Sequence, residues 1–89
     1  FAVEASEFEF TPSTFMVNEG EPIRFTVENT GEVPHEFELE KLGVEAVIPA
    51  GKSVTFTVNP PKSGVYNLVC DIPGHLEAGM SGELIVKPR

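Results

Sequence analysis

The chain has 89 residues, of which 14 are acidic and 6 are basic, and its net charge is −8. At this length we expect a single domain spanning residues 1–89, because there is no room for a second core. The negative charge argues against nucleic acid or an anionic membrane surface as a partner. No apolar run approaches the length of a membrane span, so we expect no membrane insertion by this chain.

Apolar and polar residues alternate along much of the chain, and Gly, Pro and Asn interrupt the alternation at short intervals. This pattern is typical of many short antiparallel strands. In residues 3–10 the phase of the alternation slips near Ser6, which indicates a bulge or a bend. Residues 14–18 predict a further short strand after a turn at Pro12.

The cleanest alternation lies in residues 23–28 and 53–58, each of which predicts a half-buried strand. The expected inward residues of these strands are Ile23, Phe25, Val27, Val54, Phe56 and Val58. Residues 40–46 show neither clean alternation nor a helix cap, so we expect a loop or an irregular edge strand there. Turn signals at 18–22, 29–31, 49–52 and 59–64 complete the pattern. The whole chain therefore predicts an all-β sandwich of seven to eight strands.

Cys70 is the only cysteine, so the chain forms no internal disulfide. A zinc finger or an iron–sulfur cluster would need more thiolates. A dinuclear copper centre with two bridging cysteines is excluded for the same reason. Any copper site here is mononuclear.

Residues 70–80 place Cys70, His75 and Met80 at even spacing in one segment. Soft sulfur ligands together with imidazole favour copper. Strand phase predicts that Cys70 and Met80 face inward at the two ends of this segment, because Pro73 stops the extended pattern between them. The second histidine, His35, faces the core side of an upstream strand.

His35, Cys70, His75 and Met80 would together supply two nitrogens, a thiolate and a thioether, which is a blue-copper ligand set. The other methionine, Met16, is expected to be ordinary core or strand packing. Zinc is the competing metal, since the two histidines and Cys70 could bind it with a carboxylate or water as the fourth ligand. Affinity still favours copper.

The chain resembles the cupredoxins, the family of plastocyanin, pseudoazurin, azurin and auracyanin. The resemblance covers nearly the whole chain and is strongest in residues 66–82. It implies a Greek-key β-sandwich that binds one copper ion cycling between Cu(II) and Cu(I). It also implies that His35, Cys70 and His75 bind copper in a trigonal plane, with Met80 on the axis.

The sequence departs from the family pattern at two places. Four residues, 71–74, separate Cys70 from His75, as in azurin and auracyanin, whereas plastocyanin-like members have two. Family members also often carry a neutral polar residue after the strand histidine and after the cysteine, whereas this chain has Glu36 and Asp71. Two ionised carboxylates close together would repel.

The resemblance implies a one-electron carrier between redox partner proteins, and not an enzyme. We expect the electron to leave through His75, and a partner to dock transiently near it. The small or apolar residues expected to form the docking patch are Pro34, Pro73, Gly74, Leu76, Ala78 and Gly79.

Other hypotheses about the function stay open. A copper storage or delivery module would use the same ligands, and the chain could also be an isolated cupredoxin domain of a larger copper oxidase or nitrite reductase. A Cys–His nucleophile is the enzyme alternative, which the small size of the chain disfavours.

Since the chain opens with Phe1 in place of methionine, we expect a processed or trimmed domain. We further expect a monomer in an extracytoplasmic location, periplasmic or at the cell surface.

Overall fold

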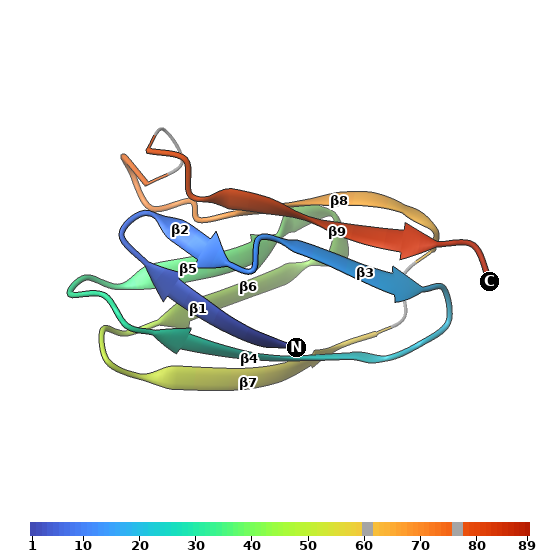
Figure 1. Ribbon diagram of the computed structural model, residues 1–89, viewed down its shortest axis with the longest axis horizontal. Coiled ribbons are helices and arrows are strands. Elements are labelled where there is room, and N and C mark those ends of the chain that lie inside the picture. Colours follow the sequence, from blue (N-terminus) through green and yellow to red (C-terminus); the bar gives the residue numbers. More distant parts are fainter. Residues whose placement is uncertain (60–61, 76–77) are drawn as a thin grey trace.

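The computed structural model describes residues 1–59, 62–75 and 78–89, which form two β-sheets packed face to face (Figure 1). The first sheet has the order β2-β1-β4-β7 and the second has the order β3-β9-β8-β5-β6. The strands of the first sheet are β1 (Ala2–Ser6), β2 (Glu9–Thr11), β4 (Ile23–Asn29) and β7 (Ser53–Val58). The strands of the second are β3 (Thr14–Asn18), β5 (His35–Leu39), β6 (Val44–Ile48), β8 (Gly64–Val69) and β9 (Ser81–Lys87).

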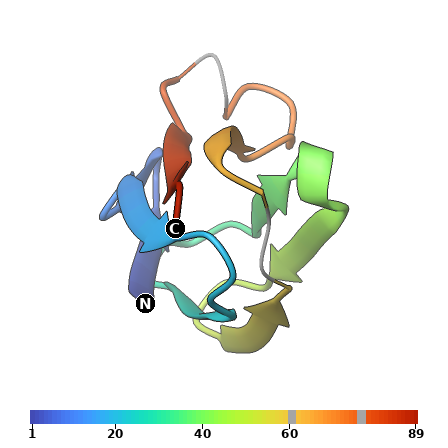
Figure 2. The same ribbon diagram turned by 90° about the vertical axis from the view of Figure 1, so that its right-hand side faces the viewer.

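The chain passes repeatedly from one sheet to the other, so strands that are distant in sequence become neighbours (Figure 2). β1 pairs with β4 and β3 pairs with β9, both in parallel register, whereas β4–β7, β5–β6, β5–β8 and β8–β9 are antiparallel. This crossing between layers confirms the predicted all-β Greek-key sandwich.

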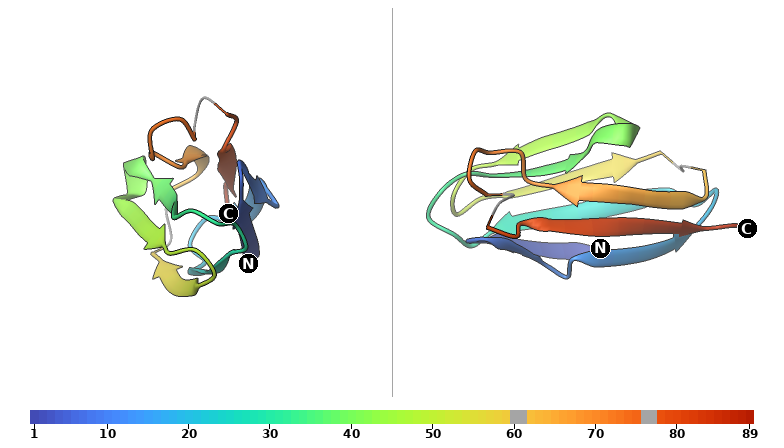
Figure 3. Two further views of the ribbon diagram at one scale, coloured as in Figure 1. Left: turned by 90° about the vertical axis from the view of Figure 1, so that its left-hand side faces the viewer. Right: turned by 90° about the horizontal axis from the view of Figure 1, so that it is seen from above.

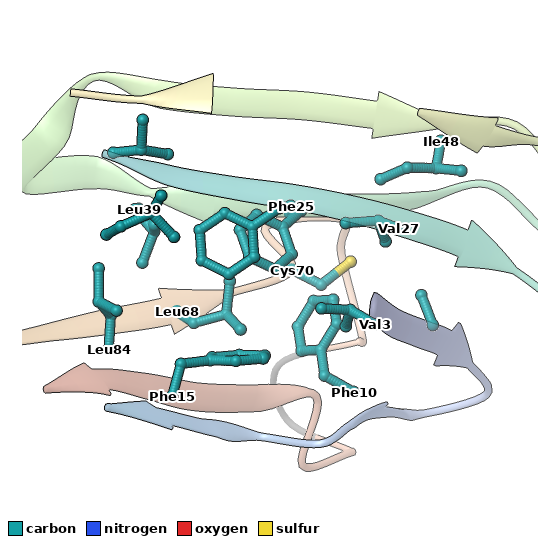
Figure 4. Packing of buried hydrophobic residues seen from close by; sticks show 14 of the residues in the cluster. Val3, Phe10, Phe15, Phe25, Val27, Leu39, Ile48, Leu68, Cys70 and Leu84 are labelled. Carbon is teal, nitrogen blue, oxygen red and sulfur yellow. The ribbon is translucent and has the colours of Figure 1, made fainter. Parts of the chain in front are cut away.

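Aromatic side chains fill the space between the sheets. Phe37 is fully buried, and its ring centroid lies 5.0 Å from that of Phe25, 5.4 Å from Phe56 and 5.7 Å from Phe10. Contacts at these distances add to the free energy gained by burying the rings. Figure 4 shows Cys70 among the buried residues of this core, with Val3, Phe10 and Val27 near it in the view. The cysteine is thus built into the packed interior.

The alternation in the sequence predicted the strand faces well. In β4 every odd residue from 23 to 29 is buried and every even one is exposed, and in β5 His35, Phe37 and Leu39 are buried. The described residues contain nine strands, more than the predicted seven to eight. The phase slip near Ser6 is a turn that separates β1 from β2, so the first extended segment is two strands.

Two further expectations are decided by the fold. Residues 40–46 contain a short 3₁₀ helix, Glu40–Leu42, and the start of β6, which is an edge strand. Met16 was expected to be ordinary core or strand packing; it lies in β3, but the core alternative is wrong, because the residue is 53% exposed on the outward face of the strand. The predicted turn at 59–64 includes Pro60 and Pro61, which lie outside the described residues.

The predicted ligand residues lie at one end of the sandwich. The segment between β8 and β9, the β1–β2 turn and the β4–β5 connection all meet at this end (Figures 1 and 3). The N-terminus and C-terminus lie away from it. Among the described residues, no helical segment is both long and apolar enough to cross a membrane.

Candidate metal centre

The four predicted ligand residues come from the start of β5 and from the segment that joins β8 to β9. His35 is the first residue of β5, directly after Pro34, whose fixed φ favours an extended entry to the strand. Cys70 follows the last residue of β8, and Met80 precedes the first residue of β9. β5 and β8 are adjacent strands, so their ends bring His35 and Cys70 together.

Three ligating atoms meet at this point. Nδ1 of His35 lies 3.3 Å from Nδ1 of His75, and Sγ of Cys70 lies 3.3 Å from the same His75 nitrogen. His35, Cys70 and His75 are all buried, and each offers one ligand atom within 4.8 Å of the others. Two imidazole nitrogens and a thiol thus converge. Strand phase predicted that His35 and Cys70 face inward, and both are buried, whereas His75 lies in a turn to which strand phase does not apply.

The segment from Cys70 to Met80 closes on itself through main-chain hydrogen bonds. The N–H of Met80 donates to the His75 carbonyl at 3.1 Å, and the N–H of Cys70 donates to the Met80 carbonyl at 3.3 Å. The side chain of Met80 is fully buried. Met80 is therefore held in the interior at the mouth of the loop, beside the strand end that carries Cys70. Leu76 and Glu77 lie outside the described residues.

A buried amide fixes the segment that leads into His35. Asn29, at the end of β4, donates through Nδ2 to the carbonyls of Val33 at 2.8 Å and Ile48 at 2.9 Å. Its Oδ1 accepts the N–H of Gly31 at 2.9 Å. Asn29 is fully buried, so these three bonds satisfy a polar group that would otherwise be costly to bury. The loop before His35 is thereby tied to both sheets.

Glu7, in the β1–β2 turn, contacts the outer nitrogen of His35. Its Oε1 lies 2.9 Å from His35 Nε2 and also accepts the N–H of Glu32 at 3.1 Å. Burial raises the pKa of Glu7, but hydrogen bonds from His35 and from the main chain of Glu32 and Val33 outweigh it and leave the pKa below its usual value. Glu7 was not among the predicted site residues.

Phe8 is the second residue that the sequence interpretation missed. Its ring centroid lies 4.8 Å from that of His75 and 6.5 Å from that of His35, although the residue is 40% exposed. The signal that could have found both residues is the interrupted alternation near Ser6. A break in the strand at that position presents Glu7 and Phe8 at the sheet end that carries the two histidines.

A second group of side chains near the centre is acidic. Carboxyl oxygens of Glu36, Glu38 and Asp71 lie within 4.8 Å of one another. One oxygen of Glu36 is buried and has no hydrogen-bond partner among the described residues. The sequence raised the possibility that Glu36 and Asp71 repel each other, and the structure does bring them close.

The donor set fits copper. His35, Cys70 and His75 offer two imidazole nitrogens and a sulfur, and soft or borderline ligands of this kind select copper among the divalent metals. Buried ligands also keep a bound ion away from bulk water. The Glu36, Glu38 and Asp71 cluster offers hard oxygen donors and belongs to a different chemical class.

Fold and donor set together define a mononuclear copper protein of the β-sandwich type. A family model for the cupredoxin-like domain matches residues 1–86, and the chain belongs to this family. It is 30% identical over 105 residues to the copper-resistant cuproprotein CopI of Rubrivivax gelatinosus, covering 96% of this chain and 64% of that protein. The chain thus spans less than two thirds of that relative.

Two further relatives are similar along most of their length. Plastocyanin of Daucus carota is 34% identical over 86 residues, which cover 86% of each protein. The crystal structure of reduced auracyanin from Roseiflexus castenholzii superimposes with a TM-score of 0.83 at 21% identity, covering 98% of this chain and 95% of that one. This structural likeness shows the shared fold.

Proposed function

We propose that this protein is a blue copper one-electron carrier, and not an enzyme. In this proposal His35, Cys70, His75 and Met80 hold a single copper ion, which supplies the Cu(II)/Cu(I) couple when bound. The observation that carries the proposal is the convergence of Nδ1 of His35, Sγ of Cys70 and Nδ1 of His75 in a buried site. The similarity to plastocyanin and auracyanin supports it.

The rigid surroundings of the ligands favour electron transfer over metal exchange. His35 enters a strand, Asn29 fixes the preceding loop, and main-chain bonds close the loop from Cys70 to Met80. Ligands held in place keep the change of geometry between the two oxidation states small. A small change of geometry is what fast electron transfer requires.

We propose His75 as the point where electrons enter and leave. His75 is 8% exposed, whereas His35 and Cys70 are fully buried. Exposed residues at the same end of the sandwich include Phe8, Pro34, Pro73, Gly74, Ala78 and Gly79. A transient redox partner docking on these residues would come close to His75; the predicted patch residue Leu76 lies outside the described residues. A monomeric state and an extracytoplasmic location stay predictions.

The proposal is tested by adding Cu(II) to the purified metal-free protein and recording visible and paramagnetic resonance spectra. We expect intense visible absorption from charge transfer between the Cys70 thiolate and copper. Line broadening in NMR spectra of mixed oxidised and reduced protein should then reveal fast electron exchange. A colourless Cu(II) complex would overturn the proposal.

A copper storage or delivery function is the second candidate, and the similarity to a protein named as a copper-resistant cuproprotein favours it. It uses the same four side chains. It differs in kinetics, because a delivery protein must release its ion readily to a partner. Rapid loss of Cu(I) to a chelator together with slow electron exchange would favour delivery; slow loss with fast exchange would favour the carrier.

A further inference from the structure

The two ring nitrogens of His35 face different surroundings. Nδ1 points toward His75, and Nε2 lies 2.9 Å from Oε1 of Glu7. An ionised carboxylate can only accept hydrogen bonds, so Nε2 carries the proton and donates it to Glu7. In the neutral ring Nδ1 then keeps its lone pair, which faces the proposed metal position. The contact with Glu7 thus selects the form of His35 that is able to bind a metal.

The carboxylate of Glu7 is itself held in place from the other side. Its oxygens accept the main-chain N–H of Glu32 at 3.1 and 3.3 Å and that of Val33 at 3.4 Å. These donors belong to the loop that leads into His35. Glu7 therefore links the β1–β2 turn, the β4–β5 loop and the histidine ring in one network, although its side chain remains 32% exposed.

Gly31 leaves the space that this carboxylate occupies. A Cβ atom on Gly31 would collide with the carboxyl group of Glu7. The φ angle of Gly31 is not positive, so its backbone conformation also suits alanine. Substituting Gly31 by alanine would thus displace the Glu7 carboxylate without changing any charge.

We propose that Glu7 is a positioning residue for His35: its carboxylate fixes the ring with Nδ1 turned toward Cys70 and His75, and its negative charge favours Cu(II) over Cu(I). This inference rests on the proposed copper function. A carboxylate hydrogen-bonded to the outer nitrogen of a ligating imidazole makes the inner nitrogen a stronger donor. A stronger donor stabilises the more highly charged ion, so Glu7 lowers the reduction potential.

Three variants separate position from charge. Glu7→Gln keeps an oxygen that can accept from Nε2 but removes the charge, whereas Glu7→Ala removes both. Gly31→Ala keeps the charge and moves the carboxylate. Glu4→Gln is the matched control, because Glu4 also bonds to the β4–β5 loop, through the Thr30 hydroxyl at 3.2 Å, and lies outside the histidine contacts.

The first measurement uses the metal-free protein. Long-range proton–nitrogen NMR spectra should show the Nε2-protonated form of His35 in the wild type, in Glu7→Gln and in Glu4→Gln. In Glu7→Ala and Gly31→Ala we expect a mixture of the two neutral forms. An unchanged His35 spectrum in folded Glu7→Ala would overturn the positioning role. If Glu7→Ala does not fold, Gly31→Ala decides this point in the same way.

The second measurement uses the copper-loaded protein. We expect Glu7→Gln to reduce the affinity for Cu(II) relative to Cu(I) about tenfold, which raises the reduction potential by about 59 mV. Glu4→Gln should leave the potential near that of the wild type. Equal shifts in Glu7→Gln and Glu4→Gln would overturn the specific role of the Glu7 charge. If the wild type gives no intense colour with Cu(II), the copper function fails, and the NMR experiment still decides whether Glu7 orients His35.

Discussion

The main-chain N–H of Glu36 donates a hydrogen bond to Sγ of Cys70 at 3.3 Å. Glu36 directly follows His35, so β5 supplies one predicted ligand and also holds the sulfur of another. An N–H donor stabilises negative charge on the sulfur, which is the form that binds a metal. Because the donor is a main-chain group, the carboxylate of Glu36 takes no part in this contact. The acidic residue at this position is therefore compatible with the site.

Cys70→Ser should abolish the visible colour of the Cu(II) protein. The colour depends on charge transfer from the thiolate, and a hydroxyl at this position offers no soft donor. Absorption spectra after addition of equimolar Cu(II) check this. Glu36→Gln is the matched control: it should retain the colour, because the main-chain bond to Cys70 remains. A blue Cys70→Ser protein would remove Cys70 from the proposed ligand set.

Met80→Leu should keep the colour and raise the reduction potential. Loss of the thioether removes a donor that stabilises Cu(II), and each tenfold loss of Cu(II) affinity relative to Cu(I) raises the potential by about 59 mV. Cyclic voltammetry of the loaded protein measures the shift. Met16→Leu is a matched control, because Met16 lies exposed on β3. An unchanged or lower potential in Met80→Leu would place Met80 outside the metal centre.

Asn29→Asp should lower the free energy of unfolding by at least about 2 kcal/mol, since two hydrogen bonds of a fully buried side chain lose their donor and a charge is buried. The carbonyls of Val33 and Ile48 would then face a carboxylate. Urea denaturation of the metal-free variant measures the change. Asn67→Asp, at an exposed position of β8, is the control. Similar stabilities of the two variants would contradict the role assigned to Asn29.

Phe37→Ala should destabilise the protein by about 3–5 kcal/mol, because it leaves a cavity where Phe10, Phe25 and Phe56 meet. Thermal or urea unfolding checks this value. Val65→Thr provides the comparison: Val65 is 52% exposed, so its substitution should change the stability by no more than about 0.5 kcal/mol. A loss below about 1 kcal/mol in Phe37→Ala would contradict the close packing of the Phe37 ring against its three aromatic neighbours.

Glu38→Gln should stabilise the metal-free protein at neutral pH. Burial raises the pKa of Glu38 above its usual 4.5, and the charges of Glu36, Asp71 and Glu45 raise it further. The folded state therefore binds more protons than the unfolded state just above pH 4.5, so this carboxyl makes the protein less stable as the pH rises through that range. Glutamine at position 38 has no ionisable group, so the variant avoids this loss of stability.

The stability difference between Glu38→Gln and the wild type should therefore shrink as the pH is lowered toward 4.5. Denaturation curves at a series of pH values measure it. Glu28→Gln, on the outer face of β4 in the other sheet, controls for the loss of one negative charge. A difference that does not vary with pH would argue against the raised pKa as its cause.

The sequence by itself determined the fold class, the inward phase of His35, Cys70 and Met80, and the soft character of the ligand set. These follow from alternation along single strands and from side-chain chemistry, which are local properties. It also indicated a break near Ser6. The exposed position of Met16 was not predicted, because periodicity fixes which residues share a face but leaves open which of those faces is covered.

Only the tertiary structure decided which distant groups surround the ligands. Glu7 lies 28 residues before His35 in sequence, and Glu36 lies 34 residues before Cys70, yet each pair is in direct contact. Such contacts depend on how β1 and β2 pack beside the β4–β5 loop and on which strands become neighbours. Strand pairing across two sheets is a non-local property, so the groups that orient the ligands emerge only when the chain is folded.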